Sequence, residues 1–206
     1  MSTEEGEKAM EHSNPAGTNT RKNIIEAARE IFARYGFRKA TMDDIARAAR
    51  KGKSSLYHYF TSKEEVFQEV VEGEAAEVKA EISRAVAAEK TPQEKFRAYV
   101  ITRMTAFKRV ANLFSAFKDE YLESYSFIER LRENYNRYEI ETITSILKEG
   151  LERGAFIVKN LELTAYAIFT AAKGLEYSWA LEPDMRKIET NIDSLLDIFF
   201  YGLVRR

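Results

Sequence analysis

Residues 40–60 read ATMDDIARAARKGKSSLYHYF and carry the clearest structural signal in the chain. Thr41 opens a short run whose apolar residues have helical spacing, and Asp44 follows three positions later, which is the pattern of a capped helix start. After the three residues 50–52, a second short run also places its apolar residues on one side of a helical wheel. Two short helices joined by a three-residue turn predict a helix-turn-helix.

The second helix of this pair has two different faces. Leu56 and Phe60 share one side, which suits a buried core. The opposite side carries a cation, hydroxyls and an imidazole: Lys53, Ser54, Tyr57 and His58. Such a face suits the major groove of DNA, where base edges are distinguishable and phosphates line both walls. Ordinary caps and solvated side chains would use the same residue types, but their arrangement together favours DNA.

Charge placement also favours a polyanionic partner. Residues 18–63 hold eleven basic and four acidic residues, so this segment carries a charge of +7. Residues 1–17 carry −3 and residues 64–206 carry −5, which leaves the chain at −1. A basic segment on an acidic body is typical of proteins that bind nucleic acid. The alternative is a random run of solvated charge.

The rest of the chain after residue 18 also has helical apolar spacing, and no alternating strand pattern appears. We expect an all-α protein of about nine helices, with an N-terminal three-helix helix-turn-helix unit and a larger C-terminal helical body. The expected parts are a disordered tail at 1–17, the DNA-binding unit at 18–63 and the body at 64–206. The expected helices cover about 20–35, 41–49, 53–60, 62–89, 92–110, 112–123, 127–153, 161–180 and the segment after Pro183.

The sequence argues against an enzyme. It has no Cys and only two His, His12 and His58, and neither belongs to a metal-binding or di-iron motif. No Gly-rich phosphate loop, G-x-S-x-G elbow or H-E-x-x-H motif occurs. We therefore expect no catalytic residue, no cofactor and no metal site.

The expected location is the cytoplasm. Residues 1–17 are acidic and have no apolar signal region. The longest uncharged stretch in the C-terminal half, residues 163–172, is about half of what a membrane span needs. We therefore expect a soluble protein with no membrane partner.

These residues resemble the TetR family of bacterial transcriptional regulators. The likeness is carried by residues 40–46 (ATMDDIA), 55–60 (SLYHYF) and 62–65 (SKEE), and it spans roughly residues 20–70. The turn at 50–52 departs from the family's usual Gly, aliphatic, Ser or Thr pattern, because it reads RKG. The resemblance implies DNA contacts by Thr41, Lys53, Ser54, Ser55, Tyr57, His58 and Lys63, with Arg21 or Lys22 reaching a neighbouring phosphate.

The resemblance also implies a homodimer formed through the last two helices. The apolar stripes of 161–180 and 188–203 suit a four-helix bundle between two copies, although a core stripe inside one chain would look similar. The candidate interface residues are Phe169, Trp179, Ile192, Leu195 and Phe199.

A small-molecule pocket is a further implication of the resemblance, and the many aromatic residues of the middle helices suit one. Aromatic stripes at helical spacing are more often core, so both interpretations stay open. Arg103 would either meet an anionic head group or extend its charged end to solvent. The candidate ligand-binding residues are Phe96, Arg103, Phe107, Phe117, Tyr121 and Tyr138.

Together these features predict a TetR-type DNA-binding transcriptional regulator. The favoured form is a homodimeric repressor that a small apolar or amphipathic effector releases from a palindromic double-stranded DNA operator. The alternative is a DNA-bound architectural or partner-recruiting protein without an effector. An open apolar cavity in the body favours the first, and a filled core with an exposed apolar patch favours the second.

Overall fold

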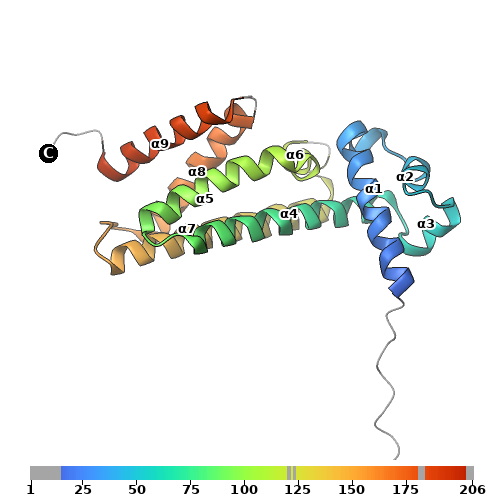
Figure 1. Cartoon of the computed structure of the whole chain (residues 1–206), viewed down its shortest axis with the longest axis horizontal. Helices are drawn as coiled ribbons and strands as arrows, with labels where there is room; N and C mark the ends of the chain where they lie inside the picture. Colours follow the sequence, from blue (N-terminus) through green and yellow to red (C-terminus); the bar gives the residue numbers. More distant parts are fainter. Residues whose placement is uncertain (1–14, 120–121, 123, 181–183, 203–206) are drawn as a thin grey trace, which may run out of the picture. The chain divides into compact units, whose positions relative to one another are not determined.

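The structure is a computed structural model that describes residues 15–119, 122, 124–180 and 184–202, without the side chains of 15–18, 107–108, 114, 117–118, 176–180 and 185. These residues form nine helices and no strand, which confirms the all-α prediction. No helix in the described part of the chain is long and apolar enough to cross a membrane. The helices are α1 Pro15–Lys39, α2 Met42–Ala48, α3 Lys53–Tyr59, α4 Lys63–Ala88, α5 Pro92–Arg109, α6 Ala111–Lys118, α7 Ser126–Glu152, α8 Leu161–Ala180 and α9 Met185–Tyr201 (Figure 1).

The chain divides into two compact units, Met1–Val70 and Val71–Arg206. The first unit holds α1 to α3 and the first two turns of α4, because the α4 side chains near its start pack into the same core as α1. The ring of Phe67 lies 4.9 Å from that of Phe32 and 4.8 Å from that of Phe37. The first unit thus extends seven residues past the boundary at Lys63 that the sequence suggests.

Helix α1 begins earlier than the sequence predicts. It starts at Pro15, so residues 15–17, which the sequence assigns to a disordered tail, are helical. Proline favours the first helical position because its ring already holds φ near the helical value and a free N–H is not needed there. Residues 1–14 lie outside the described part. Gly36 adopts φ 74° and ψ 162°, so the regular helix ends there, as the sequence predicts.

Local capping signals start several helices where the sequence places them. Thr41 accepts a hydrogen bond from the backbone N–H of Asp44, and Thr91 does the same for Glu94. In return, the side chain and backbone of each threonine donate hydrogen bonds to the carboxylate of Asp44 or Glu94, and these bonds lower the pKa of both carboxyl groups. Each cap therefore stabilises the fold fully at pH values above the ordinary carboxyl pKa. This stabilisation is lost as the pH falls through the lowered pKa. At α4 Ser62 Oγ accepts from the backbone N–H of Glu65 at 3.2 Å, and the Glu65 carboxylate accepts from the N–H and the hydroxyl of Thr61.

In the second unit α5 occupies the middle, with α7 on one side and α9 on the other (Figure 1). Polar contacts hold α4 to its neighbours. The hydroxyl of Tyr138 on α7 donates to the carbonyl of Lys79 at 2.9 Å. The buried carboxylate of Glu74 accepts from Asn112 Nδ2 at 2.8 Å and from the N–H of Leu113 at 2.7 Å. Glu74 therefore serves the free N–H groups at the start of α6, where Val110 supplies no side-chain cap.

Two glycines shape the C-terminal end of α7. Gly154 has φ 67°, and the N–H groups of Gly154 and Ala155 donate back to the carbonyls of Leu151 and Gly150 at 3.0 and 2.8 Å. This is a Schellman motif, and it ends the helix where the sequence predicts. The chain then turns so that the ring of Phe156 covers Gly150, where an added Cβ would lie 2.0 Å from a ring carbon.

We expect Gly150→Ala to lower the free energy of unfolding by about 1–3 kcal/mol, because the new methyl group forces the Phe156 ring to move. Gly73→Ala is the matched control, since a Cβ there meets nothing within 4 Å. The free energy of unfolding of that variant should rise by about 0.5–1 kcal/mol, because alanine has a better helix propensity than glycine. Urea unfolding measures both values. A gain at both positions would contradict the close approach of Phe156.

Candidate nucleic-acid interface and effector cavity

The helix-turn-helix is built from α2, a short turn and α3. Helix α2 buries Met42, Ile45 and Ala46 in the core of the first unit. In the turn the left-handed conformation falls on Arg50, with φ 53°, and not on Gly52, which has φ −70° and precedes α3. The glycine of the turn is therefore not the residue that reverses the chain. A non-glycine residue in this conformation carries a steric cost from its Cβ.

We expect Arg50→Val to lower the free energy of unfolding by about 1 kcal/mol, because a β-branched side chain fits the left-handed region less well than arginine. Lys51→Val is the control, because Lys51 is the next residue in the turn, is exposed and does not have a positive φ. Thermal unfolding followed by circular dichroism measures both. Equal losses would show that the left-handed position has no special cost.

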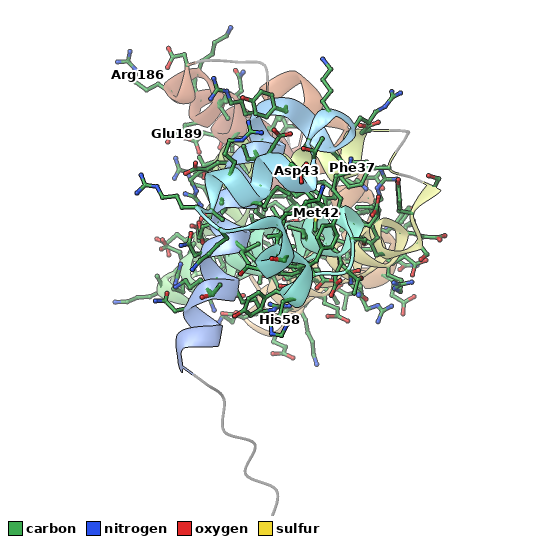
Figure 2. All side chains as sticks on the ribbon, turned by 90° about the vertical axis from the view of Figure 1, so that its right-hand side faces the viewer. Phe37, Met42, Asp43, His58, Arg186 and Glu189 are labelled. Carbon is green, nitrogen blue, oxygen red and sulfur yellow. The ribbon has the colours of Figure 1, made fainter. Side chains whose placement is uncertain are left out.

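Helix α3 has the two faces that the sequence predicts. Leu56 and the capping residue Phe60 are fully buried in the core of the first unit. Lys53, Ser54, Tyr57 and His58 are exposed on the other side. Figure 2 labels Met42 and Phe37 within this unit and His58 at its edge. The helix is thus anchored along one side and presents a hydrogen-bonding surface along the other.

Lys53 is paired with an acidic neighbour that sequence spacing did not reveal. Its ammonium group donates to Asp43 Oδ2 at 3.1 Å and lies 2.8 Å from Oδ1. This hydrogen bond raises the pKa of Lys53. Both side chains remain more than half exposed, so the pair is open to exchange with a phosphate.

Asp43→Asn should therefore tighten DNA binding a few-fold and steepen its salt dependence by about one released counterion per half-site, because Lys53 becomes available to a phosphate. Glu26→Gln removes the same charge from an exposed site on α1 and should change the slope less. The measurement is the logarithm of affinity against the logarithm of salt concentration. Identical slopes for the two variants would argue against a role for the Lys53 pair.

Two of the predicted phosphate contacts are engaged inside the first unit. The Lys63 ammonium donates to the carbonyls of Phe37 and Ala40 at 2.8 and 3.1 Å, and it lies 4.5 Å above the Phe37 ring. Arg21 forms an ion pair with Glu69, and its guanidinium lies 4.9 Å from the centre of the Phe60 ring. Both cations therefore stabilise the unit itself, whatever they do toward DNA.

The remaining predicted contacts differ in accessibility. Thr41 is exposed, and its hydroxyl donates to Asp44 Oδ2 at 2.5 Å. Ser55 is half-buried. The His58 ring meets the Tyr59 ring edge-on, with the ring centres 5.2 Å apart. The exposed cations Arg47 and Arg50 near the turn were outside the predicted set, and their only signal was the local charge count. Lys51, which the sequence offered as either a packed stem or a phosphate contact, is exposed as well.

The predicted ligand residues do not share one cavity. Phe96 lines an apolar cavity of about 240 Å³ between α5, α8 and α9. Tyr138 lines a separate, more polar cavity of about 410 Å³ between α4, α5 and α7. Arg103 is buried and bonded to the carboxylate of Glu139, with its Nη2 3.2 Å from Oε2. The side chains of Phe107 and Phe117, and the whole of Tyr121, lie outside the described residues.

The predicted interface residues fall into two groups. Phe169 and Ile192 are buried inside the second unit, so they offer little surface to a partner chain. Leu195 and Phe199 on α9 are about 40% exposed. The side chain of Trp179 is outside the described part. The predicted interface residues Ile192, Leu195 and Phe199 line the same apolar cavity as the predicted ligand residue Phe96. The sequence did not lead us to expect this overlap.

Comparison with known proteins supports the interpretation of these features. The family model described as "Bacterial regulatory proteins, tetR family" matches residues 24–70. The HTH-type transcriptional regulator QacR of Staphylococcus aureus is 24% identical over 90% of this chain and 98% of its own length. The TetR family regulator PfmR of Thermus thermophilus is 24% identical, with a TM-score of 0.68 over 88% of this chain and 99% of that one.

The fold is also similar to that of the regulator FadR from Bacillus subtilis in complex with stearoyl-CoA. That likeness has a TM-score of 0.72 at 19% identity, and it covers 89% of this chain and 99% of FadR. All three proteins are regulators, and regulators of this type are not enzymes. The chain therefore belongs to the TetR family of bacterial DNA-binding transcriptional regulators.

Proposed function

We propose that this regulator is a homodimeric repressor that reads a palindromic operator with α3 and leaves it when a small apolar or amphipathic effector binds. The observation that carries the proposal is the exposed side of α3, where Lys53, Ser54, Tyr57 and His58 stand opposite a fully buried anchor. One such helix reads too few base pairs to locate an operator alone. Two copies related by a two-fold axis read two half-sites about 34 Å apart.

Exposed apolar side chains on α8 and α9 support the homodimer. Leu163 and Tyr166 on α8 are 63% and 58% exposed, and Leu195, Ile198 and Phe199 on α9 are 40–46% exposed. Large exposed apolar patches are typical of protein–protein interfaces. A second copy is the partner that a two-fold operator requires, so we assign this surface to self-association.

The apolar cavity supports an effector. It is lined by side chains of three helices and holds about 240 Å³, which favours a ligand-responsive regulator over a DNA-bound recruiting protein. The FadR neighbour carries stearoyl-CoA, so an amphipathic effector with a hydrocarbon chain is compatible with the fold. An effector that prefers a different spacing of the recognition helices lowers DNA affinity, and DNA lowers effector affinity by the same factor.

Selection of duplexes from a random-sequence pool, at about 0.15 M salt, tests the proposal. We expect enrichment of a palindromic site whose half-sites lie about one helical turn apart, and a complex of two chains per site in analytical ultracentrifugation. The same site placed before a reporter gene should be silenced by the regulator.

Two results would overturn the proposal. Binding without an enriched motif that disappears as salt rises would mean contact with phosphates alone, and the architectural interpretation would replace ours. If the regulator activated the reporter gene instead of silencing it, the protein would be an activator and not a repressor. Because the partner in this mechanism is chromosomal DNA, the proposed place of action is the bacterial cytoplasm.

A further inference from the structure

An apolar trench is lined by side chains of three helices of the second unit, and we call its α5 side the floor and its α8 and α9 sides the walls. Figure 1 shows where these helices lie. Its volume is about 240 Å³. Every lining side chain is a hydrocarbon or thioether: Phe96, Val100, Met104, Ile168, Ala171, Ala172, Leu175, Ile192, Leu195, Leu196, Ile198 and Phe199. A polar ligand group in the trench would lose its hydration without gaining a side-chain hydrogen bond.

Two basic residues of α5 that lie next to trench-lining residues are held in ion pairs. Arg97 follows Phe96 on α5 and makes a two-pronged ion pair with Asp193 on α9, at 2.6 and 2.9 Å. Arg103 precedes Met104 and is bonded to Glu139 on α7. None of the side chains that line the trench is charged, so the lining offers an occupant neither a positive nor a negative group. This combination selects an uncharged hydrocarbon segment.

The trench has a closed floor and an open side. Phe96 and Met104 on the floor and Ile192 on the α9 wall are buried. The open side is bordered by the exposed residue Ala171 on α8 and by Ile198 and Phe199 on α9. The exposed stripe continues on α8 at residues 163 and 166, which do not line the trench. The opening therefore lies within the surface that we assign to self-association.

We propose that this trench binds the hydrocarbon chain of an effector and that a second copy, docked across α8 and α9, closes its open side. The inference rests on the proposed homodimer and adds the ligand class, the place of the site and the need for the partner. An apolar cavity of about 150 Å³ holds benzene, so about 240 Å³ suits a chain of roughly ten carbon atoms. Closure removes the exposed part of such a chain from water and so strengthens its binding.

Titration of the full-length protein with straight-chain alcohols, from 1-hexanol to 1-dodecanol, tests the ligand class by calorimetry. Each added methylene group should tighten binding about fourfold until the trench is full, near ten carbons, and further lengthening should add little. The absence of any dependence on chain length, or of binding by 1-decanol, would overturn the proposal.

Ala172→Phe tests the location, because Ala172 is buried and borders the trench. The new ring should fill the trench and weaken 1-decanol binding at least about tenfold. Ala171→Phe narrows the open side and serves if the first variant folds poorly. Ala80→Phe is the matched control on the exposed side of α4, and it should bind 1-decanol like wild type. Unchanged binding by a folded Ala172→Phe would place the chain elsewhere.

The double variant Leu163→Arg with Tyr166→Arg tests closure, since it places two charges on the dimer surface without touching the trench lining. We expect it to sediment as a monomer and to bind 1-decanol more weakly. Ile157→Arg is the control, because Ile157 is exposed but lies in the connection before α8. A monomer that binds 1-decanol like wild type would show a trench complete in one chain. A persistent dimer would move the interface away from α8.

DNA binding separates failure of this inference from failure of the proposed function. Ala172→Phe should still select the palindromic operator, since it lies outside the helix-turn-helix. If it keeps operator binding and 1-decanol binding alike, only the trench inference fails. If Ala172→Phe instead loses self-association while wild type binds no alcohol, side chains of the second copy fill the trench, and the hydrocarbon site is excluded.

Discussion

We expect Glu139→Leu to lower the free energy of unfolding by about 3–5 kcal/mol, because the substitution leaves a buried guanidinium without its counter-charge. Arg103 and Glu139 are each only 1% exposed and are bonded through both prongs of the guanidinium. The same carboxylate accepts from the Tyr99 hydroxyl at 3.2 Å, and burial raises the pKa of that hydroxyl well above its ordinary value. Urea unfolding with circular dichroism gives the difference.

Two comparisons isolate the effect of the unpaired charge. Glu141→Leu, two residues along the same helix and exposed, should change stability by about 0.5 kcal/mol at most. Adding Arg103→Leu to Glu139→Leu should recover much of the loss, because a buried ion pair can be replaced by apolar side chains at little cost. If Glu139→Leu were as stable as Glu141→Leu, the buried ion pair would not be intact in solution.

The second large effect concerns DNA. We expect Tyr57→Ala to weaken binding to the selected operator at least about 30-fold, with the fold intact. A lost base contact costs about 1–3 kcal/mol, and the proposed homodimer carries the substitution in both recognition helices. Fluorescence anisotropy at fixed salt measures the affinity, and the ratio of operator to scrambled duplex should fall with it.

Tyr35→Ala is the matched control, since both tyrosine side chains are 46% exposed but Tyr35 lies on α1. It should bind the operator like wild type. Tyr57→Phe separates the hydroxyl from the ring: retention of affinity would assign the contact to the apolar ring, and loss would assign it to the hydrogen bond. Wild-type binding by Tyr57→Ala would mean that α3 does not read the operator.

The helix-turn-helix could be predicted almost completely because its signals are local. Apolar spacing within seven or eight residues defines each short helix, and Thr41 with Asp44 marks the start of the first of them. Buried Leu56 opposite exposed Tyr57 follows from the same helical period. The exception was the turn, because its RKG sequence did not reveal that Arg50 adopts the left-handed conformation.

The partners of the charged residues could not be predicted, because they come from distant parts of the chain. Lys63 meets carbonyls 23 and 26 positions away, at Ala40 and Phe37. Arg103 meets Glu139, 36 positions away, although its sequence context suggested a ligand or solvent. Such pairs depend on which helices pack together, and each helix alone shows only that a charge lies near its apolar side.

Which apolar residues line the cavity and which form the exposed surface also depends on the tertiary structure. The helices, most of their ends and the amphipathic stripe of α9 could be predicted from the sequence, since these depend on neighbours three and four residues apart. The sequence did not determine that Ile192 is buried while Phe199 borders an open trench. Only the packing of α9 on α5 decided this, because one apolar stripe can face a core, a ligand or a second copy, and the choice depends on the helices that surround it.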